Sequence, residues 1–311
     1  MMPAARIHTG GTYGEQMSAS APLDAVVVVD KPGGLTSHGV VSRVRKLAAT
    51  PKVGHAGTLD PMATGVLVLG VGRATRLLGH LMTGVKSYET TVRLGEATST
   101  DDAEGETRKV VDATGISSED IATALGAFVG DIEQRPSAVS AIKVDGRRAY
   151  ARVRAGEKVD LPARPVMVES IDVRAVRSVH PYVDVDISVT CSAGTYVRAI
   201  ARDLGVALGV GGHLTMLRRT RVGQFTLDEA RTLEELERDY RPVPLAQAAR
   251  RSFASVDVDA QTATAVRHGR TLPAMALPAA PVVAVFDPAG LFLALYEQRG
   301  ADAAAVAVFA G

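Results

Sequence analysis

The sequence predicts an α+β protein: a mainly antiparallel mixed sheet flanked by helices, followed by a small β-rich domain. Strand and helix patterns succeed one another without the regular βαβ rhythm of a parallel fold. Residues 183–191 alternate apolar and polar side chains, as in a sheet with one buried face. After Arg241–Pro244 the expected elements become short and end in a hairpin. With 311 residues the chain can build two cores.

The first elements follow from local patterns. Residues 26–29 are a β-branched run that stops at a Pro-Gly-Gly turn, which predicts a strand. Thr36 or Ser37 can then cap a helix whose apolar side chains recur at helical spacing. Residues 66–69 and 88–94 are expected to form two further strands.

The second half of the main domain is predicted in the same way. The strand over 183–191 ends at Cys191, whose side chain falls on the apolar face and is interpreted as structural. A Ser-Ala-Gly turn then leads into a helix from about Thr195, which Gly209 ends. Further helices are expected over 117–128 and 228–238.

The ends of the chain differ from the main domain. Residues 1–24 are small and polar and are expected to be a disordered leader. The C-terminal domain, 246–311, should hold a short strand, a helix capped by Asp259, and a hairpin that pairs 282–286 with 291–296. The main domain therefore spans 25–245.

Composition excludes several classes of protein. Hydrophobic residues make up 46% and charged residues 22%, as in ordinary globular proteins. The single cysteine excludes an internal disulfide and fits a reducing compartment. No apolar run approaches the roughly 20 residues that a membrane-spanning helix needs. We expect a cytoplasmic protein without a membrane partner.

Basic residues are clustered although the net charge is only +1. Residues 31–88 contain eight Lys/Arg and one carboxylate, residues 135–158 contain seven Lys/Arg and two carboxylates, and residues 198–221 contain five Lys/Arg and one carboxylate. Such clusters can follow a phosphate backbone. They also fit three solvated faces.

The segment most indicative of chemistry is Gly54–Gly65, GHAGTLDPMATG. Its glycines and proline predict an irregular loop, where reactive side chains are commonly held. Asp60 is the lone carboxylate of the first basic stretch. An aspartate before proline often just caps a turn, and taken alone Asp60 would be interpreted so.

Arg198 and two tyrosines change that interpretation. Arg198 lies at the start of a predicted helix, where the dipole disfavours a cation, so it needs an anionic partner such as a phosphate or Asp60. Burial would raise the pKa of Asp60, and pairing with Arg198 would keep it ionised. Tyr88 and Tyr196 lie beside these motifs in a chain that is poor in aromatic residues.

Six segments resemble, in order, those of bacterial tRNA pseudouridine synthases of the TruB family. They are 28–37 (VVDKPGGLTS), 54–61 (GHAGTLDP), 86–88 (KSY), 99–105 (STDDAEG), 136–143 (PSAVSAIK) and 192–198 (SAGTYVR). The likeness covers about 25–225.

The resemblance implies a pseudouridine synthase fold and an isomerisation without cofactor or metal. A uridine at tRNA position 55 is flipped out of the T-loop, its N1–C1′ bond is cleaved, and the uracil is rejoined through C5. The partner is the T-arm stem-loop of tRNA, and we expect a monomer without an obligate protein partner. Flipping costs a few kcal/mol, which stacking on an aromatic side chain can offset at about 1–3 kcal/mol.

The same resemblance implies roles for individual residues. Asp60 matches the catalytic aspartate, Arg198 its ion-pair partner, and Tyr88 the residue that stacks on the base and can assist proton removal. The implied substrate-binding positions are His55, Tyr88, Tyr196, Leu217 and Lys31. Of these, His55 would fill the space that the base leaves, and Lys31 with Pro32 belongs to a motif that supports the site.

Two regions outside the pocket also match. Residues 130–158 align with an insertion that folds over the RNA as a thumb. Its candidates for backbone contacts, which equally fit solvent exposure, are Lys143, Arg147, Arg148, Arg152 and Arg154. Residues 246–311 resemble a PUA domain, a small β-barrel that contacts the acceptor stem.

Other functions fit less well. A dinucleotide fingerprint at Gly70 fails at Thr75, and residues 31–34 lack the Gly-Lys-Ser/Thr ending of a phosphate loop. The seven histidines show no metal-ligand spacing. The main alternative is a tRNA-binding chaperone without catalysis, but binding alone has no use for an isolated carboxylate among cations. Whether Asp60 would attack C6 of the base or C1′ of the ribose stays open.

Overall fold

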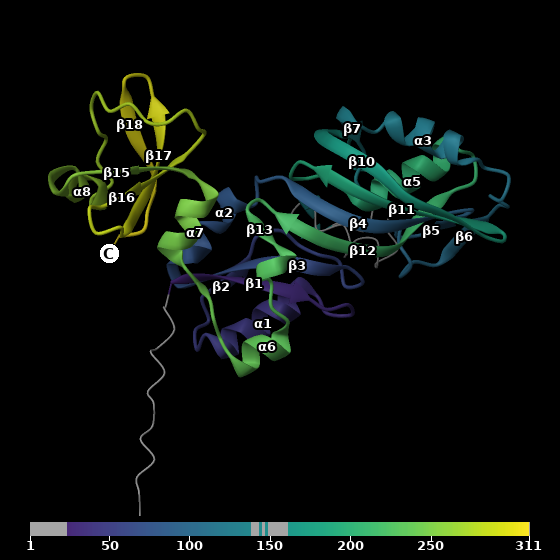
Figure 1. The fold of residues 1–311 in the computed structure, drawn as a ribbon, viewed down its shortest axis with the longest axis horizontal. Helices are drawn as coiled ribbons and strands as arrows, with labels where there is room; N and C mark the ends of the chain where they lie inside the picture. The colour runs from purple at the N-terminus through teal and green to yellow at the C-terminus, as the bar shows by residue number, and fades with distance from the viewer. Residues whose placement is uncertain (1–23, 138–142, 145–146, 149–160, 311) are drawn as a thin grey trace, which may run out of the picture.

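The computed structural model describes residues 24–137, 143–144, 147–148 and 161–310 (Figure 1). Within them, a ten-stranded sheet forms the larger lobe and a four-stranded sheet the C-terminal lobe. None of the helices in these ranges is both long and apolar enough to cross a membrane.

The large sheet follows the order β14-β1-β3-β12-β4-β11-β10-β7, with β2 paired to β3 and β13 to β12. Among these described strands only β3 and β12 pair in parallel, which confirms the predicted mainly antiparallel mixed sheet. The strands are β1 (Ala25–Lys31), β2 (Val53–His55), β3 (Thr64–Val71), β4 (Lys86–Leu94), β7 (Gly130–Gln134), β10 (Arg164–Val179), β11 (Tyr182–Cys191), β12 (Gly212–Val222), β13 (Phe225–Thr226) and β14 (Val243–Pro244).

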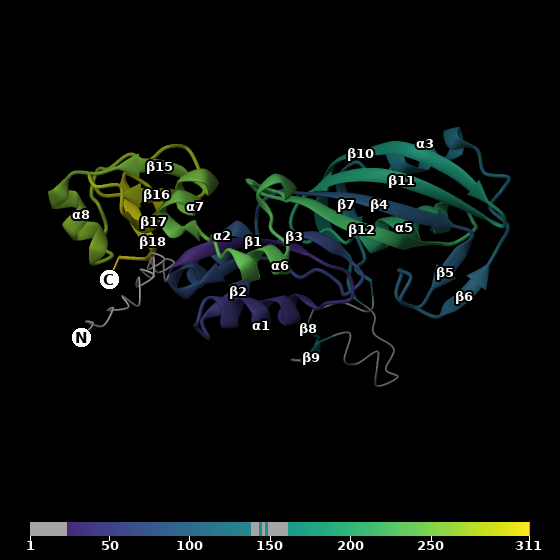
Figure 2. The same cartoon turned by 60° about the horizontal axis from the view of Figure 1, so that its bottom comes forward.

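Helices cover this sheet and fill the space between the lobes. They are α1 (Ser37–Leu47), α2 (Leu78–Leu81), α3 (Ser118–Gly126), α5 (Val197–Ala207), α6 (Leu233–Arg238), α7 (Leu245–Ser252) and the 3-10 turns η1 (Gly72–Arg76) and η2 (Leu227–Glu229). Figures 1 and 2 show α1 and α6 side by side next to β1, and α3 and α5 at the β10–β11 end of the sheet. Two small ladders pair β5 (Glu96–Thr98) with β6 (Thr107–Val110) and β8 (Lys143–Val144) with β9 (Arg147–Arg148).

Local signals predicted several of these elements correctly. The strands expected at 26–29, 66–69 and 88–94 are β1, β3 and β4. Helix α1 is capped as expected, because the Thr36 hydroxyl accepts a hydrogen bond from the amide of Gly39 at 3.0 Å.

Two expectations about elements were wrong in detail. The single helix expected over 228–238 is interrupted, because Ala230 is extended (ψ 138°) and Thr232 caps a new helix, α6. The segment 54–65 is not wholly a loop, because β2 reaches His55 and β3 begins at Thr64. The loop proper is therefore 56–63.

The C-terminal lobe comprises β15 (Ala254–Asp257), α8 (Ala260–Arg267), β16 (Val283–Phe286), β17 (Phe292–Arg299) and β18 (Asp302–Val308). The predicted hairpin is confirmed by the antiparallel pairing of β16 with β17, and Asp259 caps α8.

The two lobes share one hydrophobic core. Apolar side chains from β1, β3 and α2 pack in the same buried cluster as Phe286, Phe292 and Phe309 of the C-terminal lobe. Polar contacts reinforce this core, since Arg73 donates to the carbonyl of Phe309 at 2.6 Å and pairs with Asp24 at 2.7 Å. The C-terminal lobe is therefore built onto the main body and does not hang from a linker.

Candidate active site

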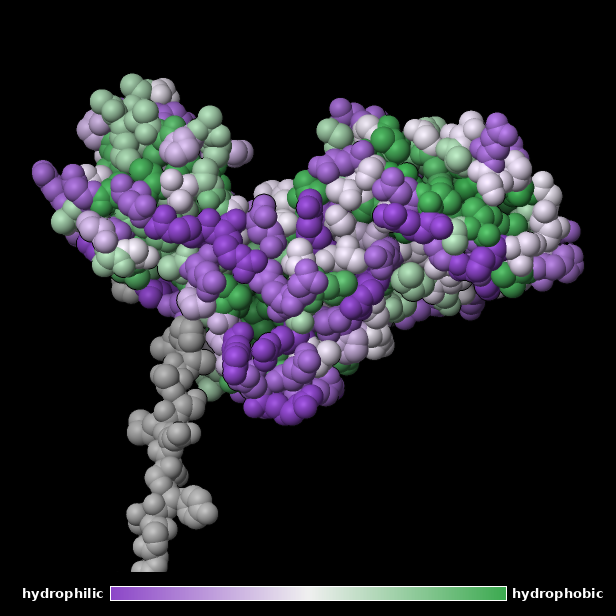
Figure 3. Space-filling model, in the orientation of Figure 1, coloured by the Kyte–Doolittle hydropathy of each residue, from purple (hydrophilic) through white to green (hydrophobic). Residues whose placement is uncertain are grey.

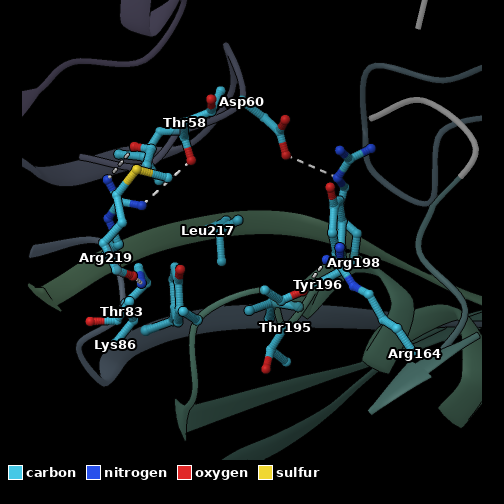
Figure 4. A pocket seen from close by; sticks show the side chains of 17 residues that line it. Thr58, Asp60, Thr83, Lys86, Arg164, Thr195, Tyr196, Arg198, Leu217 and Arg219 are labelled. Carbon is cyan, nitrogen blue, oxygen red and sulfur yellow. Dashed lines mark hydrogen bonds and ion pairs between the residues drawn. The ribbon is translucent and has the colours of Figure 1, made fainter. Parts of the chain in front are cut away.

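A cavity of about 350 Å³ opens where the loop 56–63, β4, β12 and the start of α5 converge (Figure 4). Of the residues predicted to form the site, Asp60, Tyr88, Tyr196, Arg198 and Leu217 line it. We call this cavity the active-site pocket. Segments more than a hundred residues apart in the sequence thus contribute to one wall.

Asp60 and Arg198 form an ion pair across this pocket. The Nε atom of Arg198 lies 2.9 Å from Oδ2 of Asp60 (Figure 4). The arginine side chain is 5% exposed and the aspartate 33%, so the carboxylate faces the cavity while the guanidinium is covered. The expected partner of Arg198 is therefore in place.

Arg198 also serves a second carboxylate, which the sequence did not predict as a site residue. Its Nη1 atom lies 3.3 Å from Oδ2 of Asp102 and donates to the carbonyl of Thr100 at 2.8 Å. Asp102 is 3% exposed, and its Oδ1 accepts a hydrogen bond from the amide of Glu104 at 3.1 Å. The guanidinium is thus fixed from behind while its Nε faces Asp60.

Burial sets the protonation of these groups. Loss of water raises the pKa of Asp60, the Arg198 guanidinium opposes the rise, and the neighbouring Asp102 adds to it. Burial also raises the pKa of Tyr88, against the effect of the Arg219 guanidinium, so its phenol is neutral at pH 7. Tyr88 is 8% exposed, and its side chain, with a neutral phenol, lines the pocket.

The loop that carries Asp60 is braced by buried groups. The Ser37 hydroxyl donates to the carbonyl of Leu59 at 3.0 Å and accepts from its amide at 2.8 Å. Arg219, 1% exposed, donates to the carbonyls of Val66 at 2.8 Å and Gly57 at 3.1 Å. These bonds fix the position of Asp60 before any substrate arrives.

Lys31 requires a correction, because it was expected to bind substrate. It is 0% exposed, and its ammonium donates to the carbonyls of Leu35 at 2.6 Å, Pro32 at 2.9 Å and Pro61 at 3.1 Å. Its proton donors are thus occupied inside the protein, and burial lowers its pKa to about 8. Lys31 joins the end of β1 to the loop 56–63 and is not among the residues that line the pocket.

The remaining predicted substrate-binding residues take different places. His55 lies in β2, partly buried, with its ring edge-on to His38 at 5.6 Å, and is not among the residues that line the pocket. Tyr196 and Leu217 do line it. The backbone of Tyr196 is held by Gln134, whose Oε1 accepts from its amide at 2.7 Å, and the guanidinium of Arg164 lies 5.0 Å from its ring.

The structure describes the predicted thumb residues only in part. Lys143, Arg147 and Arg148 belong to the β8–β9 ladder, of which the backbone alone is described. Arg152 and Arg154 lie outside the described residues. Their contacts with RNA stay a prediction.

Lys86 is a buried residue of the pocket lining, and Cys191 pairs with it in the β4–β11 register. The Lys86 ammonium donates to the carbonyls of Met82 at 2.7 Å and Gly84 at 3.1 Å, and burial lowers its pKa to about 8. Cys191, 1% exposed, has its pKa raised to about 11 by burial, so its thiol stays protonated. This fits the structural interpretation of that cysteine.

Family models and relatives agree with one another along the chain. Residues 45–197 match the model of the TruB family pseudouridylate synthase N-terminal domain. Residues 198–249 match the tRNA pseudouridylate synthase B C-terminal domain, and 253–310 match tRNA Pseudouridine synthase II, C terminal.

Two curated relatives, both named tRNA pseudouridine synthase B, match nearly the whole chain. That of Streptomyces griseus is 54% identical over 92% of this chain and 97% of its own. That of Rhodococcus jostii is 55% identical over 94% of this chain and 96% of its own.

Solved structures give the same fold. The chain is 28% identical to a protein in a Cbf5–Nop10–Gar1 complex, with a TM-score of 0.69 over 92% of this chain and 84% of that one. It is 26% identical to a protein in an H/ACA RNP bound to a substrate RNA containing 2′-deoxyuridine, with a TM-score of 0.69 over 92% and 85% of the two chains.

Proposed function

We propose, from the premise that this chain belongs to the TruB family of pseudouridine synthases, that it converts the uridine at position 55 of the tRNA T-loop to pseudouridine with Asp60 as nucleophile. Its family makes it an isomerase that acts on uridine in tRNA. The observation that carries the finer proposal is the pair of Asp60 with the covered guanidinium of Arg198 at 2.9 Å.

The pocket supports this chemistry in three ways. Arg198 stabilises the ionised form of Asp60, and an ionised carboxylate can act as a nucleophile. Tyr88 offers a neutral ring on which the flipped uracil can stack. The cavity of about 350 Å³ can hold the free base while it turns, with Leu217 supplying an apolar wall.

Attack on C6 of the base and attack on C1′ of the ribose both need this ionised carboxylate. In either route the N1–C1′ bond breaks, C5 bonds to C1′, and the bond to Asp60 is broken again. The proton on C5 is lost to water and N1 takes up a proton, so the product is an isomer of the substrate. No cofactor enters the balance. Tyr88 lines the pocket, and it is proposed to lie beside the reacting base and to assist the removal of that proton.

The rest of the chain is assigned to RNA binding. We propose that 25–245 is the catalytic domain, with 130–158 as a thumb whose Lys143, Arg147, Arg148, Arg152 and Arg154 contact the RNA backbone. Residues 246–311 are proposed to contact the acceptor stem as a PUA-like domain. His55 is proposed to fill the space that the base leaves. The protein is proposed to act as a cytoplasmic monomer.

Release of tritium tests the proposal. Unmodified tRNA carrying tritium at C5 of uridine should lose it to water in the presence of the protein alone. Asp60→Asn should release none and still bind the RNA, because the amide keeps the shape of the side chain but is not a nucleophile. The control Asp172→Asn, an exposed aspartate of β10, should release tritium normally.

Two outcomes separate the alternatives. If the unmutated protein binds tRNA but releases no tritium, it is a binding protein or chaperone and the enzymatic proposal is wrong. If Asp60→Asn retains activity, the nucleophile has been misassigned. Mapping the product with unmodified transcripts that lack uridine at position 55 tests the site of modification.

A further inference from the structure

A second cavity lies where the two lobes meet, and we call it the junction pocket. Its volume is about 460 Å³. Its walls come from the α2–β4 connection, the β12–β13 turn, the α7–β15 junction and residues 280–282. Figure 1 places α2 and α7 between the two sheets, and Figure 3 shows a saddle in the surface between the lobes.

The junction pocket adjoins the active-site pocket. Thr83 lines both cavities, while Met82 lines the active-site pocket and Gly84 the junction pocket. The ammonium of Lys86 donates to the carbonyls of Met82 and Gly84, so this dividing segment is held in place. The two cavities are therefore neighbours, separated by the segment 82–84.

The polar groups of the junction pocket suit an anion. The Nε atom of Arg221 is buried and has no hydrogen-bond partner among the described residues, and the same holds for Oγ of Ser252. The lining residues in the described part of the chain include no carboxylate. A buried donor without a partner costs free energy, and a guanidinium binds phosphate through a pair of parallel hydrogen bonds.

The rest of the lining suits a nucleoside attached to the phosphate. Apolar and aromatic side chains make up much of the wall, namely Leu81, Val85, Val222, Phe225, Phe253 and Pro281. Aromatic walls next to a cation are the combination that binds nucleotides of single-stranded RNA without reading their sequence. The site thus combines a phosphate contact with room for a nucleoside.

We infer that the junction pocket is a second RNA subsite, which takes a nucleotide near the modified uridine and holds its phosphate on the guanidinium of Arg221. The inference rests on the proposed function for the identity of the RNA. It goes beyond that function by assigning a contact to the junction of the lobes, outside the pocket where the base reacts.

The test is binding and turnover of a T-arm stem-loop by Arg221→Gln. Kd and KM should each rise about tenfold, as for one lost charge-assisted hydrogen bond, while kcat changes little. The slope of log Kd against log salt concentration should fall by about 0.7, the value of one phosphate contact on a single strand. Arg221→Lys should keep most of the slope.

Arg241→Gln is the matched control. It also removes one guanidinium, but Asp239 already lies 2.6 Å from that group, so Kd and slope should stay as in the unmutated protein. Equal losses in Arg221→Gln and Arg241→Gln would overturn the subsite, as would an unchanged Kd and slope in Arg221→Gln. Failure of the proposed function would appear differently, as absence of tritium release by the unmutated protein.

A second variant keeps the test decisive if Arg221→Gln lowers the melting temperature. Ala280→Trp fills the cavity from a partly exposed loop position and leaves Arg221 in place. It should raise Kd for the stem-loop at an unchanged melting temperature and unchanged kcat. Normal RNA affinity with the cavity filled would overturn the subsite.

Discussion

Arg198 holds two carboxylates, and we expect this sharing to govern the reactivity proposed for Asp60. Its Nε pairs with Asp60 and its Nη1 with Asp102. Because Asp102 is 3% exposed and bonded to the backbone of Glu104, it fixes the plane of the guanidinium. Asp102 therefore positions Arg198 without reaching the pocket.

Asp102→Asn should lower kcat about a hundredfold with little change in RNA affinity, since a small misplacement of a catalytic group can cost that much. Single-turnover tritium release together with filter binding measures both quantities. Asp101→Asn is the matched control, because Asp101 pairs with Arg202 instead and asparagine tolerates its φ of 61°. Equal effects of the two substitutions would contradict the positioning role.

Asp60 is also expected to lower the stability of the fold. Its pKa is raised in the folded protein, chiefly by burial, so the unfolded state loses this proton at lower pH than the folded state. Ionised Asp60 therefore lowers the free energy of unfolding at neutral pH. This loss shrinks as the pH falls through the pKa of Asp60 in the folded state, and it is gone below its pKa in the unfolded state.

Asp60→Asn should thus raise the free energy of unfolding at pH 7, and the gain should shrink towards pH 4. Urea denaturation across this pH range measures it, with Asp172→Asn as the control. A variant less stable than the unmutated protein at pH 7 would show that the Arg198 pair outweighs desolvation.

At the scale of elements, Lys31 joins three pieces of chain. Its ammonium contacts the carbonyls of Pro32, Leu35 and Pro61, and so ties β1 to the entry of α1 and to the loop 56–63. Lys31→Met should lower the free energy of unfolding by about 1–3 kcal/mol, because buried carbonyls lose their donor.

The pH dependence of that loss has a defined sign. The pKa of Lys31 is lowered from 10.5 to about 8, so between these values the unfolded state binds more protons and stability rises with pH. Lys31→Met lacks this contribution, and its deficit relative to the unmutated protein should grow from pH 8 to pH 10. Urea titrations test this, with the exposed Lys109→Met as the control. A constant deficit would contradict the assignment.

The sequence predicted those elements and contacts that depend on local patterns. The β-branched run of β1, the Thr36 cap of α1 and the alternation in β11 are each legible within about ten residues. Helix α7 was missed because Pro244 provides no side-chain cap and the helix is short. The break at Ala230 was missed because alanine carries no signal for an extended conformation.

The site divides in the same way. A cation at a helix start indicated an anionic partner for Arg198, either a phosphate or Asp60, and the family resemblance selected Asp60. Arg219 was missed because its partners, such as the Gly57 carbonyl, lie far away in the sequence. The apolar–polar pattern of a strand does not predict such distant hydrogen-bond partners. The segment 99–105 was singled out as a motif, but nothing local shows that Asp102 reaches Arg198.

At the scale of the whole molecule, the shared core should make the two lobes unfold together. Phe309 is 2% exposed and packs with side chains of both lobes. Phe309→Ala should lower the free energy of unfolding by about 3–5 kcal/mol in a single transition. Circular dichroism and RNA binding should follow the same denaturation curve, and Leu291→Ala, 51% exposed, should change little. Separate transitions would contradict a common core.

Cys191 gives this molecule a built-in reporter. Its sulfur is the sole sulfhydryl of the chain and is buried at the end of β11, where Cys191 pairs with Lys86 of the pocket lining. A thiol reagent can react with it only after the surrounding sheet has opened. The rate of labelling therefore measures the rate of that opening without an engineered probe. If bound RNA stabilises the sheet, labelling should be slower in its presence. The ratio of the two labelling rates would then measure how strongly RNA binding opposes local opening.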